Sequence, residues 1–219
     1  MKQRALSVLQ TGLQILLLAV TLNACSQSVA GTDYRLVTPP QLTETPGKIE
    51  VIEFFWYGCP HCAALEPSLR EWIKKQPADV NVRHVPVAYR ATLIPHQRLF
   101  YALDALGKES ELRPKIFDAI HVAKNPLETP ERIADFVAKQ GIDRKKFLDT
   151  YHSFAVESKL RRATQLVEAY GVDGVPMIAI NGKYLVSAQP NTWRVLDELV
   201  AKERALLKPN AVTAKKEKK

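Results

Sequence analysis

The chain has 219 residues, of which 46% are hydrophobic, and a formal net charge of +8. This length predicts one sizeable domain, or a domain that carries an insertion. The positive charge does not predict nucleic-acid binding, because part of it lies in the N-terminal segment and in the tail at 215–219. The remaining basic clusters lack the interleaved aromatic residues on which bases stack.

Residues 1–30 have the layout of an export signal, with basic residues ahead of an apolar stretch at 15–22 that is too short to span a membrane. Two processing sites are compatible with this segment. Cleavage after Ala30 suits an ordinary signal peptidase, whereas a lipobox-like stretch, which departs from the pattern at Asn23, would make Cys25 the site of lipidation. The second site accounts for a cysteine that would otherwise be an unpaired thiol in an oxidising compartment. The sequence leaves both sites open.

Residues 31–90 are predicted to form the first part of an α/β domain. A short strand is expected at 34–37, and the run at 50–56, which is apolar on both faces, predicts a central strand covered on both sides. A helix is expected to follow the break at Gly58 and to run to about Lys75, before a second strand at 79–87. A right-handed crossover through that helix makes these two strands parallel.

Residues 91–165 are predicted to form an inserted all-helical domain, because no strand pattern interrupts them. Proline, serine, threonine and aspartate mark the helix starts, and glycine marks several of the ends. The expected helices are 95–106, 112–123, one that Thr129-Pro130 starts and Gly141 ends, one that Asp143 caps, and one that Ser153 opens and that reaches Tyr170.

Residues 166–207 are predicted to complete the α/β domain. Two short strands, 177–180 and 183–186, flank Asn181-Gly182, which is a strong signal for a two-residue hairpin. The last helix is expected at 191–207, and residues 208–219 are predicted to be a disordered basic tail.

The sequence Cys59-Pro60-His61-Cys62 follows the central strand and opens the next helix. With Pro60 in the first turn, Cys59 is expected at the helix N-terminus, where unpaired N–H groups lower the pKa of a thiol. Cys59 is therefore the predicted nucleophile, and Cys62, one turn further in, the resolving thiol. A protonated His61 would add positive charge beside Cys59, so the reduced form is stabilised and the disulfide is a strong oxidant.

Other interpretations of these cysteines are less consistent with the pattern. A zinc site usually needs four ligands, and the chain has only one further cysteine. A purely structural disulfide closing so short a loop constrains the unfolded chain little. A metal-binding module that uses Cys59, His61 and Cys62 remains the alternative function, and the metal content of protein purified under reducing conditions distinguishes it from disulfide exchange.

Two motifs resemble those of the DsbA family of periplasmic thiol:disulfide oxidoreductases. The first is Phe54-Phe55 followed by Cys59-Pro60-His61-Cys62, and the second is Gly174-Val175-Pro176 followed by a strand and the turn at 181–184. The similarity extends from about Tyr34 to about Leu207. It implies a thioredoxin-like fold with an inserted helical domain, split here as 31–90, 91–165 and 166–207.

The resemblance also implies roles for three further residues. Pro176 is expected to follow a cis peptide bond and to face the active-site sulfurs, and Val175 is expected to pair its backbone with an extended substrate. Glu53, just upstream of the dithiol, corresponds to an acid that relays the Cys62 proton, and burial is expected to raise its pKa. The family often pairs this acid with a lysine on the next strand, where this chain has Val82 and His84.

The function that the resemblance implies is donation of the Cys59–Cys62 disulfide to newly exported proteins with free thiols. A membrane quinone-linked partner of the DsbB type then reoxidises the enzyme. No cofactor is expected, and the protein is expected to be a monomer in the periplasm, either soluble or anchored through Cys25. A disulfide isomerase is the alternative within redox chemistry, but such relatives carry an added dimerisation domain, which the few residues before Tyr34 cannot supply.

Overall fold

A computed structural model describes residues 27–213, so Cys25 and the predicted signal up to residue 26 lie outside the described residues. Within this range the chain forms a five-stranded sheet of order β1-β5-β4-β2-β3. The strands are β1 (Arg35–Leu36), β2 (Ile49–Phe55), β3 (Val80–Pro86), β4 (Met177–Ile180) and β5 (Tyr184–Ser187). Strand β2 pairs in parallel with β3, as the predicted crossover requires, and antiparallel with β4.

Strand β2 is the centre of the sheet, and all seven of its residues are buried. Its apolar residues serve two cores, since Ile49 and Val51 belong to one hydrophobic cluster and Ile52 and Phe54 to the other. This agrees with the prediction of a strand covered on both faces. The strand ends at Phe55, close to the start of the helix that carries the dithiol.

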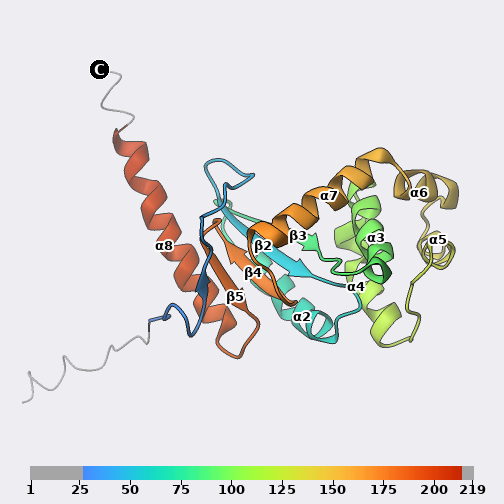
Figure 1. Cartoon of the computed structure of the whole chain (residues 1–219), viewed down its shortest axis with the longest axis horizontal. Coiled ribbons are helices and arrows are strands. Elements are labelled where there is room, and N and C mark those ends of the chain that lie inside the picture. The colour runs from blue at the N-terminus through green and yellow to red at the C-terminus, as the bar shows by residue number, and fades with distance from the viewer. Residues whose placement is uncertain (1–26, 214–219) are drawn as a thin grey trace, which may run out of the picture.

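Helices cover both faces of the sheet. They are α2 (Pro60–Lys74), α3 (Ile94–Ala105), α4 (Glu109–His121), α5 (Pro130–Lys139), α6 (Arg144–Tyr151), α7 (Phe154–Ala169) and α8 (Thr192–Thr213). Helix α8 contacts β2, β4 and β5, and its apolar residues share a cluster with Leu69 and Trp72 of α2. Figure 1 shows α3, α4, α5 and α6 gathered at the opposite end of the molecule from α8, with α7 leading back to the sheet.

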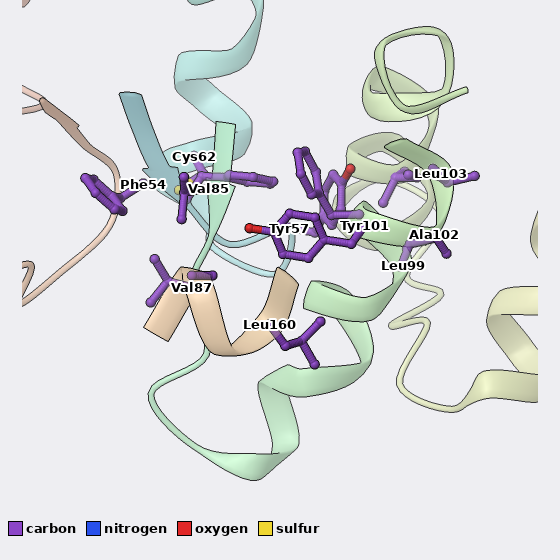
Figure 2. Close-up of a cluster of buried hydrophobic side chains, with 14 of the residues drawn as sticks. Phe54, Tyr57, Cys62, Val85, Val87, Leu99, Tyr101, Ala102, Leu103 and Leu160 are labelled. Atoms are coloured by element: carbon purple, nitrogen blue, oxygen red, sulfur yellow. The ribbon is translucent and has the colours of Figure 1, made fainter. Parts of the chain in front are cut away.

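The helical segment and the sheet share one hydrophobic core. Phe54 and Cys62, from the sheet side, belong to the same cluster of buried residues as Leu99 and Leu103 of α3. Figure 2 shows these side chains with Tyr57 between them. The dithiol therefore lies where the helical segment packs on the sheet, and a change in either part is transmitted to it through direct contacts.

The predicted helix starts are confirmed by their caps. The side chains of Thr129, Asp143 and Ser153 each accept a hydrogen bond from a backbone N–H in the first turn of α5, α6 and α7. Such caps satisfy N–H groups that the helix leaves unpaired. Helix α2 contains Pro67 and still continues to Lys74, as expected.

The last helix is longer than predicted. Helix α8 continues to Thr213, whereas the sequence predicted a disordered tail from residue 208. The helix runs past position 209, a proline, where a helix usually ends. The rest of the predicted tail, 214–219, lies outside the described residues.

We predict that Gly182→Ala destabilises the fold more than Gly107→Ala. Both glycines have positive φ, +71° and +66°, so alanine costs about 1–2 kcal/mol at either position. A Cβ at Gly182 would also lie 1.9 Å from the Gln41 carbonyl oxygen, whereas a Cβ at Gly107 meets no atom within 4 Å. Denaturant unfolding of both variants measures the difference, and equal losses would contradict the close approach of Gln41 to the hairpin.

Candidate active site

Cys59 is the N-cap residue of helix α2, with φ −81° and ψ 120°, and Pro60 begins the helix. The chain reaches this position through a tight turn in which the Cys59 N–H donates to the Trp56 carbonyl at 3.0 Å. Gly58 makes the turn possible, because a Cβ there would lie 2.3 Å from the Trp56 ring. The N-terminal backbone amides of α2 therefore point toward the Cys59 sulfur, as the sequence predicted.

The two thiols have opposite environments although only two residues separate them. A hydrogen bond from Cys62 lowers the pKa of the Cys59 thiol to about 6, with further help from the Cys62 and His61 backbone amides and the His61 charge, against the effect of burial. The same hydrogen bond, together with burial, raises the pKa of Cys62 far above its ordinary value. Cys59 therefore ionises near neutral pH while Cys62 keeps its proton.

Val175 and Pro176 lie against the nucleophile. The peptide bond between them is cis, and the Cys59 Sγ lies 3.5 Å from the Val175 carbonyl oxygen as a hydrogen-bond donor. These residues and His61 line an open groove of about 500 Å³ that also includes Met177. The sequence prediction of a cis bond close to Cys59 is confirmed, and the groove lies beside the residue whose carbonyl oxygen contacts the sulfur.

Glu53 is fully buried, but its predicted raised pKa is wrong. Burial raises the pKa of this carboxyl, yet the Arg113 guanidinium and the His84 ring more than offset burial and lower it below its usual value. His84 lies opposite Glu53 in the β2–β3 register, with 2.6 Å between His84 Nδ1 and Glu53 Oε2. Of the two neighbours weighed from the sequence, His84 is the partner and Val82 is not.

Arg113 of helix α4 was not predicted as a site residue. Its side chain is 3% exposed and binds three carboxylates, Glu53 Oε2 and Glu66 Oε2 at 2.6 Å and Glu109 Oε1 at 3.4 Å. The guanidinium also lies 4.0 Å above the Phe55 ring. A signal was present in the sequence, since Arg113 precedes Ile116 and Phe117 by three and four residues and so shares their buried helix face.

Helix α4 also holds the turn before the dithiol. The His121 Nε2 lies 2.8 Å from the Tyr57 carbonyl oxygen, and the Tyr57 hydroxyl donates to Glu109 Oε1 at 2.9 Å. Tyr57 is therefore fixed at its backbone and at its ring by one helix. The position of Cys59, two residues later, depends on this support.

The comparisons with known proteins agree on one family. The sequence model described as the DSBA-like thioredoxin domain matches residues 92–196. The thiol:disulfide interchange protein DsbA of Burkholderia cepacia is 46% identical over 177 residues, which cover 78% of this chain and 84% of that protein. The chain belongs to the DsbA family. It is accordingly a thiol:disulfide oxidoreductase, with Cys59 and Cys62 as its expected redox pair.

Solved DsbA structures have the same fold. The crystal structure of Pseudomonas aeruginosa DsbA matches with a TM-score of 0.79 at 41% identity, over 83% of this chain and 97% of that one. Reduced DsbA1 from Neisseria meningitidis matches with a TM-score of 0.76 at 31% identity, over 84% and 99%. The predicted fold class, a thioredoxin-like α/β fold with a helical insertion, is confirmed.

The described residues hold neither a metal-binding cluster nor a membrane-spanning helix. Among residues 27–213, no group of three or more His, Cys, Asp or Glu side chains is arranged to hold a metal ion. No helix in this same range is long and apolar enough to cross a membrane.

We predict that Cys62→Ala raises the Cys59 pKa more than His61→Ala does, because the Cys62 hydrogen bond lowers that pKa most and the His61 charge least among the named causes. In the wild type the thiolate fraction should rise with pH through about 6 and then level off. Thiolate ultraviolet absorbance, followed against pH, measures all three proteins. A larger shift in His61→Ala would show that charge, and not the hydrogen bond, sets this pKa.

Proposed function

We propose that this protein donates its Cys59–Cys62 disulfide to newly exported proteins. The observation that carries this is the asymmetry of the dithiol. Cys59, whose pKa is lowered to about 6, is 7% exposed and contacts Val175, which lines the open groove, while Cys62 is 0% exposed. An incoming substrate therefore reaches one sulfur only.

The exchange proceeds in two displacement steps. A substrate thiolate attacks Cys59 Sγ, the Cys59–Cys62 bond breaks, and Cys62 leaves as a thiolate that takes up a proton. The second substrate thiolate then attacks the substrate sulfur of the mixed disulfide, and Cys59 leaves as a thiolate. The substrate loses two electrons and the enzyme dithiol gains them. Val175 would align the substrate strand through its backbone.

The environment of Cys59 favours this direction. Cys59 is a thiolate only in the reduced enzyme, where it takes part in no disulfide. Every interaction that stabilises this thiolate therefore favours reduction of the Cys59–Cys62 disulfide. Pro60 begins the helix whose N-terminus holds the sulfur, and the charge of His61 lowers the Cys59 pKa. Oxidation of a substrate dithiol is then downhill, and turnover requires a partner that removes the electrons.

For that partner we propose a quinone-linked membrane protein of the DsbB type. It would dock over the groove that His61, Val175 and Met177 line, because the Val175 carbonyl oxygen lies 3.5 Å from the Cys59 sulfur. The reaction then needs no cofactor bound to this chain. Export to the periplasm supplies both the reduced substrates and this partner.

The test is disulfide transfer from purified oxidised protein to a reduced, unfolded secretory protein. Alkylation and mass spectrometry count the thiols of both proteins, and two substrate thiols should disappear for each enzyme disulfide reduced. Cys59→Ala should be inactive because the attacked sulfur is missing. The reduced Cys62→Ala protein, given a substrate disulfide, should hold a stable mixed disulfide at Cys59.

A wild-type protein that transfers no disulfide would overturn this function. Stoichiometric zinc or copper in protein purified under reducing conditions would then support the metal-binding alternative at Cys59, His61 and Cys62. A mixed disulfide found on Cys62 instead of Cys59 would contradict the assigned order of the two thiols.

We also propose that the mature chain begins at Cys25 and is lipid-anchored. Ser28 and Val29, which cleavage after Ala30 would remove, make contacts with the rest of the fold, and these contacts support a mature chain that begins at Cys25. The Ser28 N–H donates to Glu198 Oε2 of helix α8 at 2.7 Å, and the Val29 N–H donates to Asp33 Oδ2 at 2.8 Å. Cleavage after Ala30 would remove both contacts from the mature fold.

Mass spectrometry of the mature N-terminus tests this. We expect a chain that begins at Cys25 with three acyl groups and that fractionates with membranes, and we expect Cys25→Ala to lose the acyl mass. A free N-terminus at Gly31 would instead make the enzyme soluble and would contradict the anchor.

A further inference from the structure

The charged cluster behind the dithiol has more acids than bases. One guanidinium, Arg113, binds Glu53, Glu66 and Glu109, and the four residues are between 0% and 8% exposed. If all three carboxyls were ionised, the single positive charge of Arg113 would leave these four buried residues with a net charge of −2. Such charge is costly away from water, so a cluster of this composition favours binding a proton.

The contacts indicate which carboxyl binds the proton. Glu53 Oε2 has two donors, Arg113 Nη2 and His84 Nδ1, both at 2.6 Å. Among residues 27–213, Arg113 Nε is the one donor to Glu66 Oε2, also at 2.6 Å. Because donors to a carboxylate stabilise its charged form, Glu53 is the better anion and Glu66 the better proton acceptor.

The pKa directions agree with this division. Burial raises the pKa of Glu66 and the nearby Glu53 charge raises it further, and Arg113 offsets these effects only in part. The pKa of Glu53 is lowered. Two acids whose environments separate their pKa values in this way take different roles in proton transfer, and the acid shifted toward neutral pH is the more effective carrier.

Glu66 also has the right position on its helix. It follows Cys62 by four residues on α2, so both side chains lie on the same buried face of the helix. Among the described residues, Glu66 Oε1 and Glu53 Oε1 are both buried without a hydrogen-bond partner. Either oxygen is free to bind a proton, directly or through one water, so the donors to the Oε2 atoms decide between the two acids.

We propose that Glu66 is the proton relay of Cys62, and that Arg113 is the positioning residue that holds Glu66 for this role while keeping Glu53 as the fixed charge. This inference rests on the proposed function, whose cycle requires Cys62 to gain and lose a proton. The groups whose charges act on Glu66 are Arg113 from α4, Glu53 from β2 and His84 from β3. Glu109 of α4 shares the Arg113 guanidinium, and Cys62 lies one turn earlier on the same helix.

The relay acts in both directions of the cycle. When the enzyme is reoxidised, the Glu66 carboxylate takes the proton of Cys62, and the Cys62 thiolate attacks Cys59 Sγ in the mixed disulfide. A new Cys59–Cys62 bond forms and the partner sulfur leaves as a thiolate. When the enzyme oxidises a substrate, Cys62 is the leaving group and Glu66 returns the proton.

The test isolates this step with oxidised glutathione. Reduced protein is mixed with excess oxidised glutathione, the reaction is quenched with acid, and mass spectrometry follows the Cys59 mixed disulfide as it closes to Cys59–Cys62. At neutral pH, Glu66→Gln should close at least about a hundredfold more slowly than wild type. Glu66→Asp, which keeps the carboxyl, should recover part of the rate.

The pH profile separates a relay from a structural role. The wild-type closing rate should rise through the Glu66 pKa and level off, because the base is then ionised, whereas Glu66→Gln should keep rising with pH. In Glu53→Gln the closing rate should still level off, but at lower pH than in wild type, because loss of the Glu53 charge lowers the Glu66 pKa. Glu71→Gln, on the exposed face of the same helix, is the matched control and should equal wild type.

Two outcomes would overturn the relay. One is a Glu66→Gln profile that superimposes on wild type, and the other is loss of the levelling in Glu53→Gln alone, which would make Glu53 the relay. Neither outcome affects disulfide transfer by the wild-type protein, so failure of the proposed function remains a separate result.

Discussion

A single buried guanidinium joins the parts of this protein that carry its chemistry. Arg113 comes from helix α4, and its partners Glu53 and Glu66 come from strand β2 and helix α2, which lead into and out of the dithiol turn. Removing one partner of a buried pair typically costs about 3–5 kcal/mol, because the other charge is left without compensation. The helical insertion is therefore bound to the redox site by charge as well as by the shared core.

This arrangement differs from an acid paired with a lysine on the neighbouring strand. Here the neighbouring strand supplies His84, and the permanent positive charge arrives from α4. Because an arginine keeps its charge at any pH that proteins tolerate and presents several donors in a fixed plane, it can organise more than one carboxylate. Glu53 and Glu66 thus share one arginine but differ in pKa, which is lowered for Glu53 and raised for Glu66.

The dithiol has a similar division of roles. Cys59 lies at the helix N-terminus and against Val175, which lines the groove, whereas Cys62 is fully buried in the core cluster that also includes Phe54 and Val85 (Figure 2). One hydrogen bond between the two sulfurs stabilises the thiolate of Cys59 and the thiol of Cys62 together. The short spacing is sufficient for this difference because a helix start changes from exposed to buried within one turn.

The sequence by itself determined the local elements and the reactive pair. The apolar run of β2, the start of α2 at Pro60, the caps at Thr129, Asp143 and Ser153, and the Asn181-Gly182 hairpin all depend on neighbours in the chain, so their residue types predicted them. The Cys59 motif and the Val175-Pro176 motif also came from sequence, through resemblance to a family.

Only the tertiary structure decided the electrostatics behind the dithiol. The pKa of Glu53 was predicted to rise because burial alone was considered, and it is lowered because Arg113, 60 residues away in sequence, donates to it. The sequence places Arg113 and Glu66 on helices but does not pair them. The β2–β3 register and the packing of α4 bring them together in the folded protein. The sign of a pKa shift depends on such long-range neighbours, which the spacing of residues along a chain does not specify.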